Sequence, residues 1–142
     1  MSLVVPNAAE VIALKIWVGF GAVANPWTLK LYSNNVTPGA SDTAATYTVV
    51  AGAGYANKSL VAANWTFTSD APSSMSYAAQ SFVFTGVTDA PGTIYGYYII
   101  DNNSTIVVAE RLTGATVPFV PTLNGDSVTV TPRITLGSVT SD

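Results

Sequence analysis

Residues 93–111 form the strongest local pattern in the sequence, two strand-like runs joined by a short polar turn. Residues 93–100 and 105–111 are rich in Ile, Val and Tyr, and Asp101-Asn102-Asn103-Ser104 separates them. β-Branched and aromatic residues favour strands, and Asp and Asn tolerate the positive φ that tight turns require. The pattern therefore predicts a β-hairpin. Gly96, inside the first strand, indicates either a bulge or a bulky cross-strand neighbour.

Alternation of apolar and polar residues continues through most of the chain after residue 26. It is clearest in residues 27–32 and 127–136, where one set of alternate positions is apolar, and in residues 77–85 Phe82 and Phe84 share a face. A period of two is that of a strand with one buried face, and Gly, Pro and Asn residues mark turns between these segments. We therefore predict an all-β fold, an antiparallel β-sandwich or barrel, in a single domain spanning residues 26–142.

Residues 1–25 differ from the rest of the chain and predict an N-terminal arm with a short helix. Asn7 and Glu10 are spaced as in a capping box, and apolar residues recur at helical spacing from Ala8 to Val18. This helix is apolar on most sides, so it must pack against its own sheet or a neighbouring subunit. Lys15 interrupts the apolar stretch, which is shorter than the roughly 18 residues of a membrane span, and we expect neither a membrane segment nor a signal peptide.

Charged residues are scarce in this chain, and the residue types that several classes of chemistry require are absent. Charged residues make up 9% of the 142 positions, and there is no Cys and no His. Their absence excludes thiolate nucleophiles, disulfides, ordinary zinc sites and the commonest general base. Five scattered basic residues in a chain of net charge −3 argue against nucleic acid as a partner. A weakly charged exterior favours close contact with another protein.

The acidic residues do not form a catalytic or metal-binding pattern. Most of them stand beside Gly, Pro, Asn or Ser, where an Asp side chain bonds local backbone. Glu110 and Arg111 lie in a strand and point to opposite faces, and we expect cross-strand partners for them, with Arg133 and Lys30 as candidates. Asp101 to Asn103, or Asn124 with Asp126, could offer oxygen ligands to calcium, but neither has the spacing of a dedicated site. We predict no enzymatic activity, no catalytic residue, no metal and no cofactor.

The aromatic residues allow two interpretations. Trp17, Trp27, Trp65 and the tyrosines of residues 95–98 could stack against carbohydrate, whereas alternation with Thr places Trp27 and Trp65 in the core. Tyr97 and Tyr98 point to opposite faces of their strand, so one of them is expected at a surface or interface. The residues predicted to contact a partner are those of the arm and an exposed aromatic: Pro6, Ile12, Ile16, Trp17 and Tyr98.

Short motifs along nearly the whole chain resemble a group of small virion proteins of tailed bacteriophages. Three of the motifs are a Val-Pro-Asn-x-x-Glu arm in Val5 to Glu10, a Leu-Lys-Leu-Tyr strand in Leu29 to Pro38 and a Gly-Tyr-Ala segment in Gly54 to Ala56. The other three are a Tyr-Gly-Tyr-Tyr strand in Tyr95 to Tyr98, an Ala-Glu-Arg strand end in Ala109 to Arg111 and an Asn-Gly-Asp turn at the start of Asn124 to Leu136. The resemblance implies a capsid cement or decoration protein, or a tail or fibre component. Cement proteins of this kind typically form trimers on the outer face of the capsid.

Two functional hypotheses follow from the residues and the resemblance. In the first, the chain is made in the host cytoplasm and becomes a structural protein of the virion, a homotrimer that binds the major capsid protein at the capsid surface. Neither nucleic acid nor a membrane is a partner in this hypothesis. In the second, it is a tail-fibre or receptor-binding module that recognises host surface glycans through exposed Tyr and Trp residues.

Overall fold

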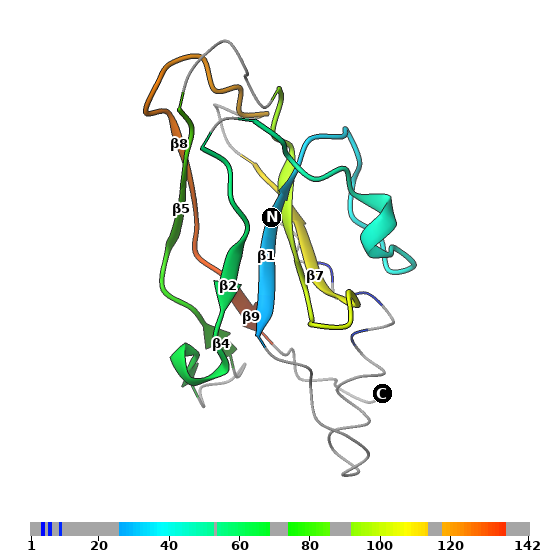
Figure 1. Ribbon diagram of the computed structural model, residues 1–142. Helices are drawn as coiled ribbons and strands as arrows, with labels where there is room; N and C mark the ends of the chain where they lie inside the picture. Colours follow the sequence, from blue (N-terminus) through cyan, green and yellow to red (C-terminus); the bar gives the residue numbers. More distant parts are fainter. Residues whose placement is uncertain are drawn as a thin grey trace.

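The computed structural model describes Val4, Pro6, Ala9 and residues 26–52, 54–68, 74–85, 92–113 and 118–135. These residues form nine strands and two short 3-10 helices: β1 (Trp27–Tyr32), η1 (Ala44–Thr46), β2 (Lys58–Leu60), η2 (Ala62–Asn64), β3 (Thr66–Thr68), β4 (Ser74–Ser76), β5 (Gln80–Val83), β6 (Gly96–Ile100), β7 (Ile106–Arg111), β8 (Ser127–Val130) and β9 (Arg133–Thr135). The strands in this part of the chain pair antiparallel, which confirms the predicted all-β antiparallel fold (Figure 1). Of the predicted helix Ala8–Val18, only Ala9 is described, and it is helical.

A four-stranded sheet with the order β2-β1-β6-β7 forms the centre of the molecule. The predicted hairpin is confirmed as β6 and β7, which pair from Gly96 opposite Arg111 to Ile100 opposite Ile106. In the turn between them Asp101 accepts hydrogen bonds from the backbone of Asn103 and Thr105, at 2.9 and 2.7 Å. The residue with positive φ is Ser104, at 63°.

The remaining strands form two smaller sheets that continue one another. One has the order β3-β4-β9 and the other pairs β5 with β8. Because β4 leads into β5 and β8 leads into β9, residues 74–83 run antiparallel to residues 127–135 along their whole length. The ladder is interrupted at Pro132, which has no N–H, yet its carbonyl accepts a hydrogen bond from Tyr77 N at 2.9 Å.

The main hydrophobic core lies between the four-stranded sheet and these two smaller sheets. From the first it takes residues of β1, β2, β6 and β7, and from the others residues of β5, β8 and β9: Leu29, Leu31, Leu60, Tyr97, Ile99, Val107 and Val108 meet Phe82, Phe84, Val128, Val130 and Ile134. The predicted alternation is therefore confirmed in β1, where Leu29 and Leu31 face this core and Tyr32 faces away from it.

Residues 33–47 cover the opposite face of the four-stranded sheet. Figure 1 shows this segment, with η1 in cyan, on the side away from β5 and β8. Tyr47 from the segment packs against Tyr32 and Tyr98 of the sheet and forms a second apolar cluster with them. A Cβ at Gly96 would overlap Tyr32 Oη and the carbonyl oxygen of Glu110. Of the two predicted reasons for Gly96, the bulky cross-strand neighbour is therefore the observed one.

Tyr55 joins the two layers at the edge of β1. Its hydroxyl accepts a hydrogen bond from Leu31 N at 3.0 Å, and its ring stacks on Phe82 of β5 with centroids 5.7 Å apart. Gly54, next to it, has a φ of 84° and lies so near β5 that a Cβ would come within 2.7 Å of Val83 O. Any larger residue there would be strained twice, by its backbone conformation and by this contact.

Candidate functional site

The carboxylates of Asp42, Asp101 and Asp126 all accept hydrogen bonds from nearby backbone or hydroxyl groups. Asp42 accepts from Gly39 N at 2.8 Å and from the Tyr47 hydroxyl at 2.6 Å. Asp126 accepts from the backbone of two residues in its own turn, at 2.7 and 2.8 Å, and these bonds hold the pKa of its carboxyl below the usual range. For these three residues the prediction that the acids belong to turns is confirmed.

Glu110 is 9% exposed, and its carboxylate accepts a short hydrogen bond from the Tyr97 hydroxyl. The two residues stand directly opposite one another in the β6–β7 register. Burial, followed by this hydrogen bond, raises the pKa of Tyr97. Arg133 and Lys30, the predicted partners, are not the residues that Glu110 contacts, because the nearest side chain across the ladder is a tyrosine. The hydrogen bond engages the Glu110 carboxylate within the chain.

Arg111 points to the other face of β7, as predicted, and holds the 33–47 segment onto the sheet. Its guanidinium donates hydrogen bonds to Val36 O at 2.8 Å and to Asn35 Oδ1 at 2.7 Å, and lies 5.1 Å from the centre of the Tyr95 ring. Here too the expected partners, Arg133 and Lys30, are replaced by groups that come from a distant loop. The contacts give Arg111 a structural role.

Tyr98 is 1% exposed, so the prediction that it is an exposed contact residue is wrong. The ring of Tyr47 stacks on it with centroids 4.9 Å apart and planes 20° apart. Tyr97, on the opposite face, is buried as well. The strand pattern correctly separates the two rings, but it gives no information on which distant segment covers each face.

The arm residues predicted to contact a partner are only partly described. Pro6 is buried within its own chain, and Val4 exchanges two backbone hydrogen bonds of 3.1 Å with Ala109 of β7. Pro6 is therefore not an exposed contact residue in this structure, and nearby Val4 pairs with the edge strand of its own sheet. The predictions for Ile12, Ile16 and Trp17 concern positions outside the described residues.

The tryptophans Trp27 and Trp65 pack against the main core, as the alternation predicts. Their rings meet edge to face with centroids 5.5 Å apart, and Trp65 meets Tyr77 in the same way at 5.2 Å. The indole N–H of Trp27 is buried and has no hydrogen-bond partner among the described residues. These rings form an apolar end to the molecule and do not present a flat stacking platform.

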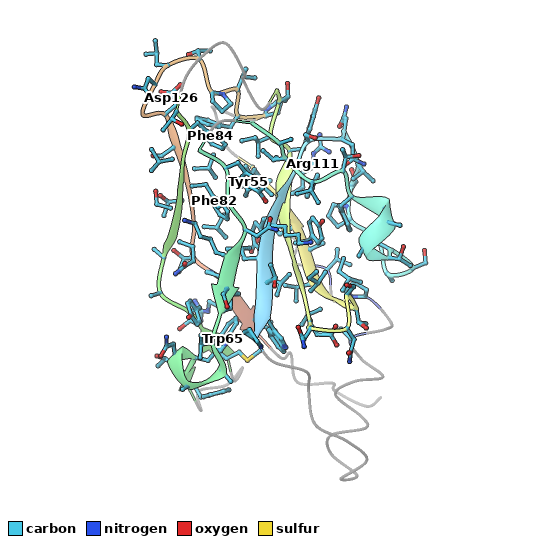
Figure 2. All side chains as sticks on the ribbon, viewed as in Figure 1. Tyr55, Trp65, Phe82, Phe84, Arg111 and Asp126 are labelled. Atoms are coloured by element: carbon cyan, nitrogen blue, oxygen red, sulfur yellow. The ribbon has the colours of Figure 1, made fainter. Side chains whose placement is uncertain are left out.

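Among the described residues, the two most exposed large apolar side chains lie at opposite ends. Phe67 of β3 is 73% exposed, and Leu123 of the turn before β8 is 67% exposed. In Figure 2, Trp65, next to β3, lies at one end, and Asp126, in the turn of Leu123, lies at the other. Smaller exposed apolar residues are Val49, Val61, Val83 and Val120. This distribution was not predicted from the sequence, because alternation identifies an apolar face without showing whether another sheet covers it.

Within the described residues, no three His, Cys, Asp or Glu side chains gather as a metal site would require. The two loops considered for calcium use Asp101 and Asp126 to bind their own backbone. No helix in the described parts of the chain is both long and apolar enough to cross a membrane.

Comparison with protein-family models, with curated proteins and with solved structures finds no match to this chain. The functional argument therefore rests on the site itself and on the sequence motifs.

Proposed function

We propose that the chain is a non-enzymatic structural protein of a bacteriophage virion, a capsid cement or decoration protein that binds the major capsid protein on the outer face of the shell. One observation carries the proposal: the described carboxylates are engaged within the chain, while two large apolar side chains, Phe67 and Leu123, are strongly exposed. Such a surface suits neutral contact with another protein. The resemblance of the sequence motifs to small virion proteins supports the same assignment.

A protein of this kind stabilises a shell by mass action, because it binds assembled subunits better than separate ones. A homotrimer multiplies contacts that are weak one by one, since the second and third contacts form at high effective concentration. Small apolar contacts at the ends of the domain are sufficient under these conditions. The proposal therefore does not require a large interface on a single copy.

The direct test uses capsids assembled from the coat protein encoded by the same genome and lacking this chain. Added protein is expected to sediment with the capsids to a saturable occupancy and to raise the temperature at which they disassemble. Separate coat subunits serve as the control, and we expect them to bind more weakly. A chain that stays in the supernatant at every concentration would refute the proposal.

The arm is tested in the same assay by removing residues 1–18. The expected result is a lower occupancy than that of the full chain, because the apolar arm is predicted to contact a neighbouring subunit. Unchanged occupancy would remove the arm from the binding surface and leave the rest of the proposal standing.

The glycan-binding alternative is weakened because Tyr98, the tyrosine predicted to be exposed, is buried under Tyr47. Trp27 and Trp65 also pack against the core. We expect no binding to a glycan array, and specific binding there would favour the receptor-binding hypothesis over the capsid one.

A further inference from the structure

Phe67 lies on the core-facing side of its sheet, although it is exposed. In the β3-β4-β9 register, Phe67 stands opposite Met75, and Met75 stands opposite Ile134. Residues opposite one another in a ladder share a face. Ile134 is buried in the main core, Met75 packs against that core, and Phe67 is 73% exposed. The apolar row thus continues beyond the part of the sheet that the rest of the molecule covers.

The other rows of the same sheet are polar, so Phe67 does not belong to the polar face of this sheet. Thr66 and Ser76 line up with Arg133, and the next row is formed by Thr68, Ser74 and Thr135. The sheet therefore has one polar face and one apolar face, as expected of a sheet that is covered on one side. We call the uncovered part of the apolar face, Phe67 and Met75, the Phe67 shelf.

The strand that carries the shelf is also an unprotected edge. β3 pairs with β4 on one side, and its other side has no strand partner among the described residues. Natural edge strands usually carry a charge or a proline that prevents further pairing. β2 contains Lys58, and β9 begins at Arg133 directly after Pro132, but β3 reads Thr-Phe-Thr.

Neighbouring aromatic rings hold this edge in place. Trp65, immediately before β3, packs edge to face against both Trp27 and Tyr77. The Tyr77 hydroxyl accepts hydrogen bonds from Val61 N at 3.2 Å and from Asn64 Nδ2 at 3.3 Å, which ties η2 to the same cluster. An edge that is already ordered loses little conformational entropy when a partner binds.

We propose that β3 accepts an added strand from the coat subunit, an extended, uncharged segment whose apolar side chains cover the Phe67 shelf. This proposal rests on the proposed function. Backbone groups along the open edge supply hydrogen bonds, and the shelf selects the side chains, as in other cases of strand addition. Because neither β3 nor β4 carries a charge, a charged segment would lose its hydration without gaining an ion pair.

The area of the shelf favours this occupant over a second copy of the chain. A phenylalanine contributes on the order of 200 Å², whereas each partner in a stable complex of standard size buries about 800 Å². β3 is also only three residues long, so few backbone hydrogen bonds can form. A dimer joined by this edge alone would be weak, but the same contact repeated over a shell is strengthened by avidity.

The test compares Phe67→Lys with Leu123→Lys, a matched change at the other strongly exposed apolar residue. Each variant must first show the melting temperature of the wild type, and Phe67→Thr, which keeps a strand-forming residue, provides a second variant at the same position. In the capsid assay we expect Phe67→Lys to bind about tenfold more weakly or worse, and Leu123→Lys to bind better than Phe67→Lys. If Phe67→Lys and Phe67→Thr both bind as well as the wild type, the proposal is overturned while the proposed function stands.

A second arm of the test does not depend on capsids. A library of random linear peptides is selected on the immobilised chain, and the enriched peptides are then tested on both lysine variants. We expect uncharged peptides that bind the wild type and Leu123→Lys but not Phe67→Lys, and that slow amide hydrogen exchange in residues 66–68. Peptides that bind Phe67→Lys equally, or no enrichment at all, would overturn the proposal even if capsids bind. Self-association that depends on Phe67, measured by sedimentation equilibrium, would identify a second copy as the occupant and overturn it as well.

Discussion

Raising the pH above about 10 is expected to unfold this protein, because several buried tyrosines must stay protonated in the folded state. Tyr32, Tyr47, Tyr97 and Tyr98 are all buried. Burial is the main reason that the pKa of each is raised, to about 12 for Tyr32. For Tyr97 the hydrogen bond to the Glu110 carboxylate acts in the same direction.

The size of the effect follows from proton linkage. In the unfolded chain a tyrosine hydroxyl ionises near pH 10, so above that pH the unfolded state releases protons that the folded state retains. Each tyrosine with a strongly raised pKa lowers the free energy of unfolding by about 1.4 kcal/mol per pH unit, so Tyr32, Tyr47 and Tyr97 together lower it by roughly 4 kcal/mol per pH unit. The contribution is fully present below pH 10 and is lost as the pH rises. Since small domains have a total stability of about 5–15 kcal/mol, unfolding is expected within about one to three pH units above pH 10.

The assay is urea unfolding at a series of pH values between about 9 and about 11.5, followed by tryptophan fluorescence, with tyrosinate absorbance recorded in parallel. The control is Tyr32→Phe, because burial is the largest cause of the raised pKa of Tyr32. This variant is expected to reduce the slope between about pH 10 and about pH 12 by about 1.4 kcal/mol per pH unit.

Two results would refute this reasoning. The first is tyrosinate absorbance from these residues that develops near pH 10 while the fluorescence still reports a folded protein. The second is a free energy of unfolding that stays constant through this range. Either would mean that the tyrosine hydroxyls reach solvent without unfolding.

Three further predictions concern single positions. Gly96→Ala is expected to lower the free energy of unfolding by roughly 3 kcal/mol or more, because its Cβ would overlap backbone. The control, Gly39→Ala, has ordinary space for a Cβ and should lower the free energy of unfolding by less than about 1 kcal/mol. Equal losses of stability in thermal melts would contradict this prediction. Tyr97→Phe leaves the buried Glu110 carboxylate without its hydrogen-bond donor and should lower the free energy of unfolding by roughly 1.5–3 kcal/mol. In urea unfolding, the double variant with Glu110→Gln should lose less stability than the sum of the two single variants. Strict additivity would count against an interaction between the two residues. Asp126→Asn should make the free energy of unfolding depend less on pH in the acid range. The lowered pKa of Asp126 gives stability that is present above about pH 4 and is lost as the pH falls. A variant that shows the same acid dependence as the wild type in urea unfolding would refute this prediction.

Features encoded by neighbouring residues could be predicted from the sequence. The β6–β7 hairpin, the two faces of β1 and the turn roles of Asp101 and Asp126 all depend on patterns within a few positions. In each case the period of the strand or the local chemistry of the turn determines the outcome. These features make up the fold class and most of the strand register within the hairpin.

Features that depend on distant segments could not be predicted in the same way. Tyr98 is buried because Tyr47 stacks on it, and Glu110 is satisfied by Tyr97 and not by a basic residue. Phe67 shows the converse, since it alternates with threonine as a core residue would, but it is 73% exposed and no sheet of the described residues covers it. The alternation gives the direction of a side chain, and only tertiary packing decides what it meets.

At the edge of β1, a tyrosine hydroxyl occupies a position that a strand would otherwise fill. β2 pairs with the first half of β1 and residues 48–50 with the second half, while Tyr55 Oη bonds Leu31 N in between. The two pairings are not joined by a continuous ladder. Asn57 Oδ1 accepts a hydrogen bond from the same Tyr55 hydroxyl at 2.9 Å, so amide exchange at Leu31 is expected to report on a side-chain contact and not on a strand pairing.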